Sequence, residues 1–166
     1  MSELGKNAVN VALIGAGTVG GGTLNVLTHN ADIITARALP IHVRWVATLT
    51  EEEGRAAIEK AGATDVRVTT DWREAVSDPD VDIVVELIGG TTVARDIIST
   101  ALKAGKSAVT ANKDLMATHG GELLAIAAEH QTDLFFEASV GGGIPIIQAL
   151  KENLAGNNFN EIIGIV

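Results

Sequence analysis

The sequence contains no cysteine and no tyrosine among its 166 residues. Without cysteine, the chain cannot form disulfides, thiolate metal sites or a thiol nucleophile. Without tyrosine, it has no phenol to act as an acid or base. No apolar run reaches the length of a membrane span, and the polar start MSELGKN differs from a signal peptide. These absences predict a cytoplasmic protein that does not enter a membrane.

Positive charge is also scarce, because 12 lysines and arginines stand against 21 aspartates and glutamates, for a net charge of −9. A nucleic-acid partner needs a basic face, so this class of partner is excluded. The chain does have the length of one domain, 46% apolar residues, and 18 glycines against three prolines. This composition indicates a globular domain with many tight turns.

Apolar runs alternate with segments of helical periodicity along the whole chain. The predicted strands span residues 9–14, 41–49, 66–70, 81–88, 107–111 and 133–138. Strands that alternate with helices predict an α/β fold of the Rossmann-like type, with a doubly wound, mainly parallel sheet and helices on both faces.

Three local patterns predict finer detail. Asp71 and Glu74 resemble a capping box at the start of a short helix. Gly120 and Gly121 predict a break between a short helical turn and a longer helix. Glu137 lies near the end of the last predicted strand, where alternation is expected to turn its carboxylate outward.

The first predicted strand runs into a glycine turn, in the sequence VNVALIGAGTVGGG. Gly15, Gly17 and Gly20 form G-x-G-x-x-G between a strand and a helix, the context that favours dinucleotide binding. Gly15 would allow the tight turn, Gly17 would admit a pyrophosphate, and Gly20 would let the helix pack on the strand. The competing interpretation is that these small residues serve tight packing alone. The predicted cofactor contacts of this turn are Gly15, Ala16, Gly17, Thr18, Val19, Gly20, Gly21 and Gly22.

Further candidate residues follow the other strands, where a doubly wound sheet binds its ligands. Thr48 and Thr50 can bond a ribose hydroxyl or a phosphate. Glu51 could accept a hydrogen bond from the ribose or equally be a charge at a helix start, so NAD and NADP both remain open. Ile88, Gly89 and Gly90 end the fourth strand and would admit a flat ligand. Lys113 directly follows the fifth strand. It could hold a carbonyl, carboxylate or phosphate oxygen, or equally be a solvated lysine at a helix start.

Four segments together resemble the nucleotide-binding half of homoserine dehydrogenase. They are GAGTVGGG at 15–22, ELIGG at 86–90, TANKDLMATHG at 110–120 and EASVGGGIPII at 137–147. The resemblance implies an NAD- or NADP-dependent enzyme that interconverts L-homoserine and L-aspartate 4-semialdehyde, in threonine and methionine biosynthesis. It also implies a small-molecule substrate and a homodimer for the full-length protein.

The resemblance also assigns roles to particular residues. Lys113, the lysine of TANK, is implied to be catalytic, near the nicotinamide and the substrate. Glu137, Val140, Gly142 and Ile144 are implied to hold a sodium-like ion, mostly through backbone carbonyls. The sequence departs from the family at Leu49, where members often carry an arginine, and this weakens any expectation of NADP preference.

The expected organisation is therefore a loose tail over residues 1–8, a dinucleotide-binding domain over 9–161, and the start of a strand over 162–166. That strand would lead into a substrate and dimerisation domain beyond the chain, so the chain alone is expected to bind cofactor without turnover. Two alternatives remain, an aspartate-dehydrogenase-like oxidoreductase and a non-catalytic nucleotide-sensing module. Dehydrogenases that need a catalytic cysteine or a Tyr-x-x-x-Lys pair are excluded by composition.

Overall fold

The structure, a computed structural model, describes residues 7–158 and residue 161. Residues 1–6 of the predicted tail and the predicted strand over 162–166 lie outside the described residues. No helix in the described part of the chain is long and apolar enough to cross a membrane.

Six strands form one sheet, in the order β3-β2-β1-β4-β5-β6. All the neighbouring strands pair in parallel, which confirms the predicted sheet. The strands are β1 (Val9–Ile14), β2 (Ile41–Ala47), β3 (Arg67–Thr69), β4 (Ile83–Glu86), β5 (Ser107–Thr110) and β6 (Leu134–Phe135). The order reverses between β1 and β4, and a doubly wound sheet binds its ligands at such a point.

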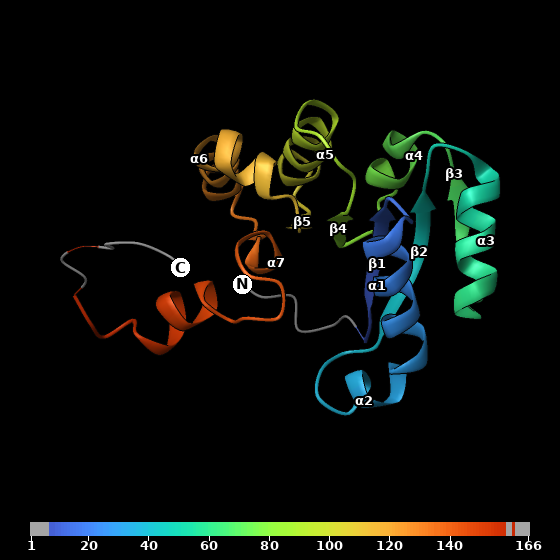
Figure 1. The fold of residues 1–166 in the computed structure, drawn as a ribbon, viewed down its shortest axis with the longest axis horizontal. Coiled ribbons are helices and arrows are strands. Elements are labelled where there is room, and N and C mark those ends of the chain that lie inside the picture. Colours follow the sequence, from blue (N-terminus) through green and yellow to red (C-terminus); the bar gives the residue numbers. More distant parts are fainter. Residues whose placement is uncertain (1–6, 159–160, 162–166) are drawn as a thin grey trace.

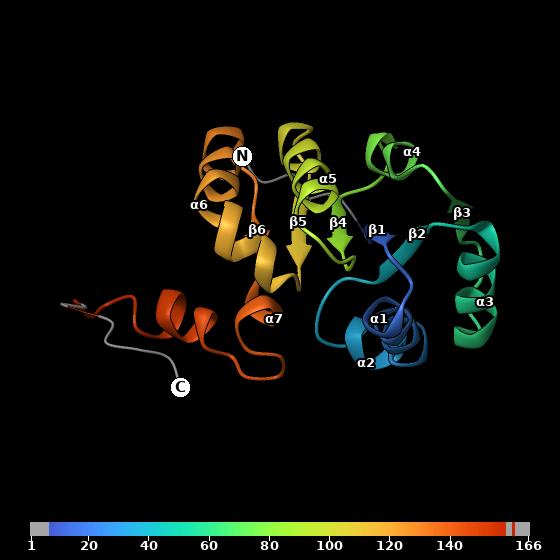
Figure 2. The same ribbon diagram turned by 45° about the horizontal axis from the view of Figure 1, so that its top comes forward.

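Helices cover both faces of this sheet (Figures 1 and 2). Helices α4, α5 and α6 lie on one face, and α1 and α3 lie on the other. The segment that follows α7 extends away from the sheet in both views. The helices are α1 (Thr18–His29), α2 (Ala31–Thr35), α3 (Glu51–Ala61), α4 (Trp72–Ser77), α5 (Thr92–Lys103), α6 (Lys113–His130), α7 (Glu137–Val140) and a single π-helical turn, η1 (Ala149–Asn153).

The central strand β1 is buried on both faces. Ala12 and Ile14 belong to the apolar cluster that includes residues of α4 and α5, while Leu13 packs with Leu24 of α1 and Val46 of β2. Successive side chains of a strand point to opposite faces, so a continuous apolar run suits a strand covered on both sides. This packing fixes the position of the turn that follows β1, at the carboxyl ends of the strands.

The helix break predicted at Gly120 and Gly121 is wrong, because α6 is one helix of 18 residues. Gly120 is buried, and a Cβ atom there would lie 3.1 Å from Cε of Met116. Leu115 and Leu123 of the same helix are buried in a cluster with residues of α5. This packing outweighs the cost of glycine inside a helix, about 1 kcal/mol for each residue.

The capping box predicted at Asp71 and Glu74 is only half present. The Asp71 carboxylate caps α4 by accepting the backbone N–H of Arg73 at 3.0 Å. The Glu74 carboxylate does not reach back to Asp71, and accepts instead the hydroxyl of Thr69 at 2.6 Å. The two side chains therefore fix the link between β3 and α4 through separate bonds.

Candidate functional site

The three glycines of the G-x-G-x-x-G turn serve different purposes. Gly15 has a φ of +97°, and a Cβ atom there would lie 2.8 Å from the carbonyl oxygen of Leu87. A Cβ atom on Gly20 would lie 1.9 Å from the carbonyl oxygen of Gly15. Packing therefore explains Gly15 and Gly20. A Cβ atom on Gly17 would have no protein atom within 4 Å, so the space above Gly17 is open.

Helix α1 begins at this open space. Gly17 is its N-cap residue and offers no side-chain acceptor, and the first turn contains no acidic residue. The first N–H groups of a helix have no partner within the helix, and the helix dipole places partial positive charge there. The start of α1 therefore has the properties of an anion site, and a pyrophosphate is the anion that the turn predicts.

A cleft of about 300 Å³ extends from this turn across the carboxyl ends of β1, β2, β3 and β4. Its walls are mainly apolar, as adenine requires. The lining residues are Ile14, Gly15, Ala16, Gly17, Ala47, Thr48, Leu49, Glu53, Thr70, Trp72, Leu87, Ile88, Gly89, Val93 and Ile97. A second hollow, of about 680 Å³, lies between α1 and α3, and it shares Ala16, Gly17 and Glu53 with the cleft.

Most of the predicted cofactor residues line one of these two hollows. Gly15, Ala16, Gly17, Thr48, Ile88 and Gly89 line the cleft, and Thr18, Gly21 and Gly22 line the second hollow. Val19, Gly20, Gly90 and Lys113 line neither hollow. Gly20 is buried under the turn, while the side chain of Val19 is exposed on the outer face of α1.

Glu86, at the end of β4, is a site residue that the sequence analysis missed. Its side chain is fully buried and accepts the hydroxyl of Thr110 at 2.5 Å and the backbone N–H of Ile88 at 2.8 Å. The backbone N–H of Asn112 donates to the Thr110 hydroxyl oxygen at 3.0 Å, and the Asn112 amide donates to the carbonyl oxygen of Gly90 at 2.7 Å. This Glu86 network joins the ends of β4 and β5 to the 88–90 loop.

Burial raises the pKa of Glu86 above its usual range, and the hydrogen bonds from Thr110 and Ile88 only partly offset this effect. The unfolded chain therefore loses this proton at a lower pH than the folded protein. As pH rises from the unfolded pKa to the folded pKa, the folded state binds more protons than the unfolded state, and stability falls.

We expect Glu86→Gln to remove this pH-dependent loss of stability, because the glutamine amide stays neutral at every pH. The free energy of unfolding of Glu86→Gln minus that of the unmodified protein should increase as pH rises above the unfolded pKa. Urea unfolding over a pH series measures the difference. Glu129→Gln, at an exposed position on α6, serves as the control. A difference that does not change with pH would contradict the assigned cause.

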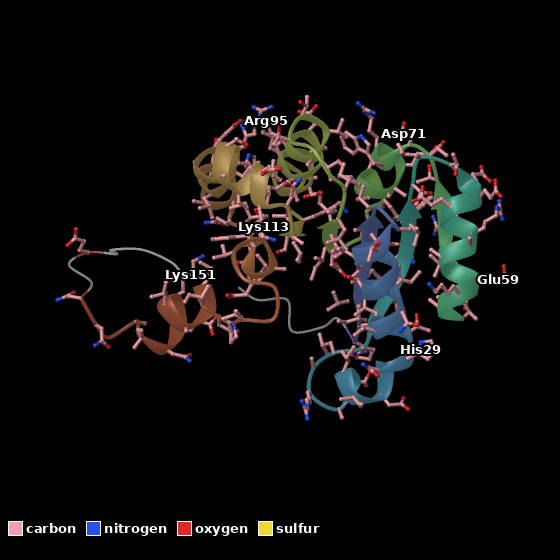
Figure 3. The ribbon with its side chains drawn as sticks, viewed as in Figure 1. His29, Glu59, Asp71, Arg95, Lys113 and Lys151 are labelled. Carbon is pink, nitrogen blue, oxygen red and sulfur yellow. The ribbon has the colours of Figure 1, made fainter. Side chains whose placement is uncertain are left out.

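Lys113 lies outside the cleft, at the first position of α6 (Figure 3). The Asn112 side chain caps this helix by accepting the backbone N–H of Leu115 at 3.0 Å, so Asn112 links Lys113 to the Glu86 network. Lys113 is exposed and lines a hollow of about 450 Å³ that also includes Ser139 and Val140. The structure therefore brings Lys113 together with the EASVGGGIP segment.

The prediction that Glu137 points outward from a strand is wrong. The last strand ends at Phe135, and Glu137 begins α7. Its carboxylate accepts the backbone N–H groups of Ile146, Ile147 and Gln148 at 2.6, 2.8 and 2.9 Å. Desolvation raises the pKa of Glu137, but these three hydrogen bonds together bring the pKa below its usual value.

The backbone of the same segment contains carbonyl oxygens that accept no hydrogen bond from the described residues. Among the hydrogen bonds of the described residues, none ends on the carbonyl oxygens of Val140, Gly142 or Ile144. The carbonyl oxygen of Glu137 accepts the N–H of Gly141 at 3.0 Å. No group of three or more histidine, aspartate or glutamate side chains in the described chain has the geometry of a metal site. A cation in this loop would therefore depend on carbonyl oxygens, which suit sodium-like ions.

Comparison with known proteins identifies the family. A family model described as homoserine dehydrogenase, NAD binding domain, matches residues 15–137. The chain belongs to this family. Family membership favours the homoserine dehydrogenase interpretation over an aspartate-dehydrogenase-like oxidoreductase.

Individual homoserine dehydrogenases match nearly the whole chain. Curated homoserine dehydrogenases from Pseudomonas aeruginosa and Neisseria gonorrhoeae are each 43% identical over 159 residues, covering 95% of this chain. The chain spans 35% of the length of each relative. The crystal structure of a homoserine dehydrogenase from Thiobacillus denitrificans is 44% identical, with a TM-score of 0.82. That match covers 90% of this chain and 34% of the crystallised chain.

Proposed function

We propose that this chain binds NAD or NADP for a homoserine dehydrogenase that interconverts L-homoserine and L-aspartate 4-semialdehyde, in threonine and methionine biosynthesis. The open space above Gly17 carries the proposal, because packing explains Gly15 and Gly20 but does not explain Gly17. The pyrophosphate would lie at the start of α1, and the adenosine would lie in the apolar cleft beside it.

The nicotinamide ring of a bound cofactor would accept or donate the hydride, and the chain's own residues would bind and orient the reactants. The 88–90 loop, held by the Glu86 network, would contact the cofactor beyond the end of β4. Lys113, fixed at the start of α6, would hold an oxygen of the substrate by a charge-assisted hydrogen bond. The carbonyl oxygens of Val140, Gly142 and Ile144, which accept no hydrogen bond within the described chain, would hold a sodium-like ion in the segment whose Val140 lines the same hollow.

We further propose that the chain by itself does not turn over, and that the whole protein is a cytoplasmic homodimer. Hydride transfer needs substrate and cofactor in close, aligned contact. The chain corresponds to 35% of the length of each matched relative, and Lys113 is exposed. The remaining part of the enzyme would close the cleft over the substrate.

The substitution Gly17→Ser tests cofactor binding with a variant that should still fold. The N-cap residue has an extended ψ of −156°, which serine also adopts, and a serine hydroxyl can accept the free N–H groups of α1. We expect Gly17→Ser to keep or raise thermal stability and to weaken cofactor binding by about tenfold or more, because the side chain fills the phosphate space. Calorimetric titration with NADH and NADPH measures the affinity.

Gly156→Ser is the matched control, because Gly156 is exposed, a Cβ atom there would have no neighbour within 4 Å, and it lines neither the cleft nor the second hollow. It should leave the affinity unchanged. If the unmodified chain binds neither NADH nor NADPH, the proposed function is wrong. If Gly17→Ser binds as tightly as the unmodified chain, the pyrophosphate lies elsewhere.

A further inference from the structure

One charged side chain lines the cleft. Among the fifteen cleft-lining residues of the described chain, only Glu53 carries a charge. Glu53 also lines the second hollow, so this residue lies where the two hollows meet beside Gly17. It belongs to the first turn of α3, and the short link 48–50 joins that helix to the end of β2.

This place corresponds to the adenosine ribose of a bound dinucleotide. With the pyrophosphate at the start of α1, the ribose of a doubly wound domain lies over the end of the second strand. NAD carries a hydroxyl at the ribose 2′ position, whereas NADP carries a phosphate there. A carboxylate accepts a hydrogen bond from the hydroxyl and repels the phosphate.

No described side chain between β2 and α3 carries a positive charge that could neutralise a phosphate. Leu49 follows β2 with 92% of its surface exposed, and it carries no charge. The hydroxyl of Thr48 donates to the carbonyl oxygen of Thr50 at 2.7 Å, and the Thr50 hydroxyl accepts the N–H of Glu53 at 3.3 Å. Both threonine hydroxyl groups therefore make hydrogen bonds within the link between β2 and the first turn of α3.

Among the described residues, the cations of α3 and α4 do not line the cleft. Arg55 pairs with Glu51 at 2.8 Å on the exposed face of α3. Arg73 pairs with Asp71 at 3.4 Å, and its guanidinium lies 4.5 Å from the centre of the Trp72 ring. Lys60 is in the last turn of α3 and lines only the second hollow.

We propose that this site selects NAD over NADP, and that Glu53 is the residue that determines the selection. The inference rests on the proposed function. The Glu53 carboxylate accepts the 2′-hydroxyl of NAD, and no cation at position 49 compensates its repulsion of the 2′-phosphate of NADP.

Titration of the chain with NADH and NADPH tests the proposal. We expect NADH to bind at least about tenfold more tightly than NADPH. Glu53→Gln should reduce this ratio severalfold, mainly by tightening NADPH binding. Glu52→Gln removes the same charge from a neighbouring position that lines neither hollow, and it should leave the ratio unchanged. Leu49→Arg should favour NADPH.

The outcomes separate this proposal from the proposed function. Equal binding of the two cofactors, or tighter binding of NADPH, would overturn the selection while leaving the cofactor site in place. An unchanged ratio in Glu53→Gln, with melting temperature preserved, would overturn the role of Glu53. Absence of binding by either cofactor would overturn the proposed function, and this inference with it.

Discussion

Replacing Gly20 by alanine is expected to lower the free energy of unfolding by about 3 kcal/mol or more. The new Cβ atom would lie 1.9 Å from the carbonyl oxygen and 2.7 Å from the carbonyl carbon of Gly15. Both are backbone atoms of a turn that is itself tight, because a Cβ atom on Gly15 would meet the backbone of Leu87. Neither α1 nor the turn can give way without disturbing the packing of β1.

Gly22→Ala provides the matched comparison within the same helix. A Cβ atom at Gly22 has no neighbour within 4 Å, so alanine should raise stability by up to about 1 kcal/mol through its helix propensity. Urea unfolding of both variants at one pH measures the two changes. Equal stabilities for Gly20→Ala and Gly22→Ala would contradict the close approach of α1 to the turn.

Replacing Lys113 by alanine is expected to lower kcat by about a hundredfold or more in an active enzyme, with the cofactor Kd unchanged. The lysine is exposed at the start of α6, outside the cleft, so its loss should affect the substrate more than the dinucleotide. The assay needs the chain joined to the remaining part of the Pseudomonas aeruginosa homoserine dehydrogenase, to which it is 43% identical.

Lys103→Ala is the control for this experiment, because it removes the same charge from an exposed position in the last turn of α5. The joined protein must first oxidise homoserine with unmodified Lys113. Full activity in Lys113→Ala would show that the lysine is only a solvated residue at a helix start.

The sheet and the glycine turn could be predicted because their signals are local. β1 is a continuous apolar run and β2 alternates apolar with polar residues, and the turn after β1 has a spacing that few other structures require. The break at Gly120 was predicted wrongly because helix propensity is also local, whereas the packing of α6 on α5 joins residues far apart in the sequence. A pattern within one segment cannot show what covers that segment.

The carboxylates show the same limit at the candidate site. Glu137 follows a short apolar run, and the sequence does not reveal that its partners are N–H groups of residues 146–148. Glu86 lies within the segment DIVVELI, which is mostly apolar and was predicted only as a strand. A carboxylate in an otherwise apolar strand, three residues before two glycines, was the signal that could have found it.

The Glu86 network also means that the 88–90 loop and the start of α6 become ordered when the chain folds, before any cofactor binds. Its hydrogen bonds are internal to the folded chain, so the 88–90 loop and the first turn of α6 lose their freedom during folding. A dinucleotide would then bind to a loop that is already ordered. Little conformational entropy is then lost there on binding, and more of the contact energy remains as affinity.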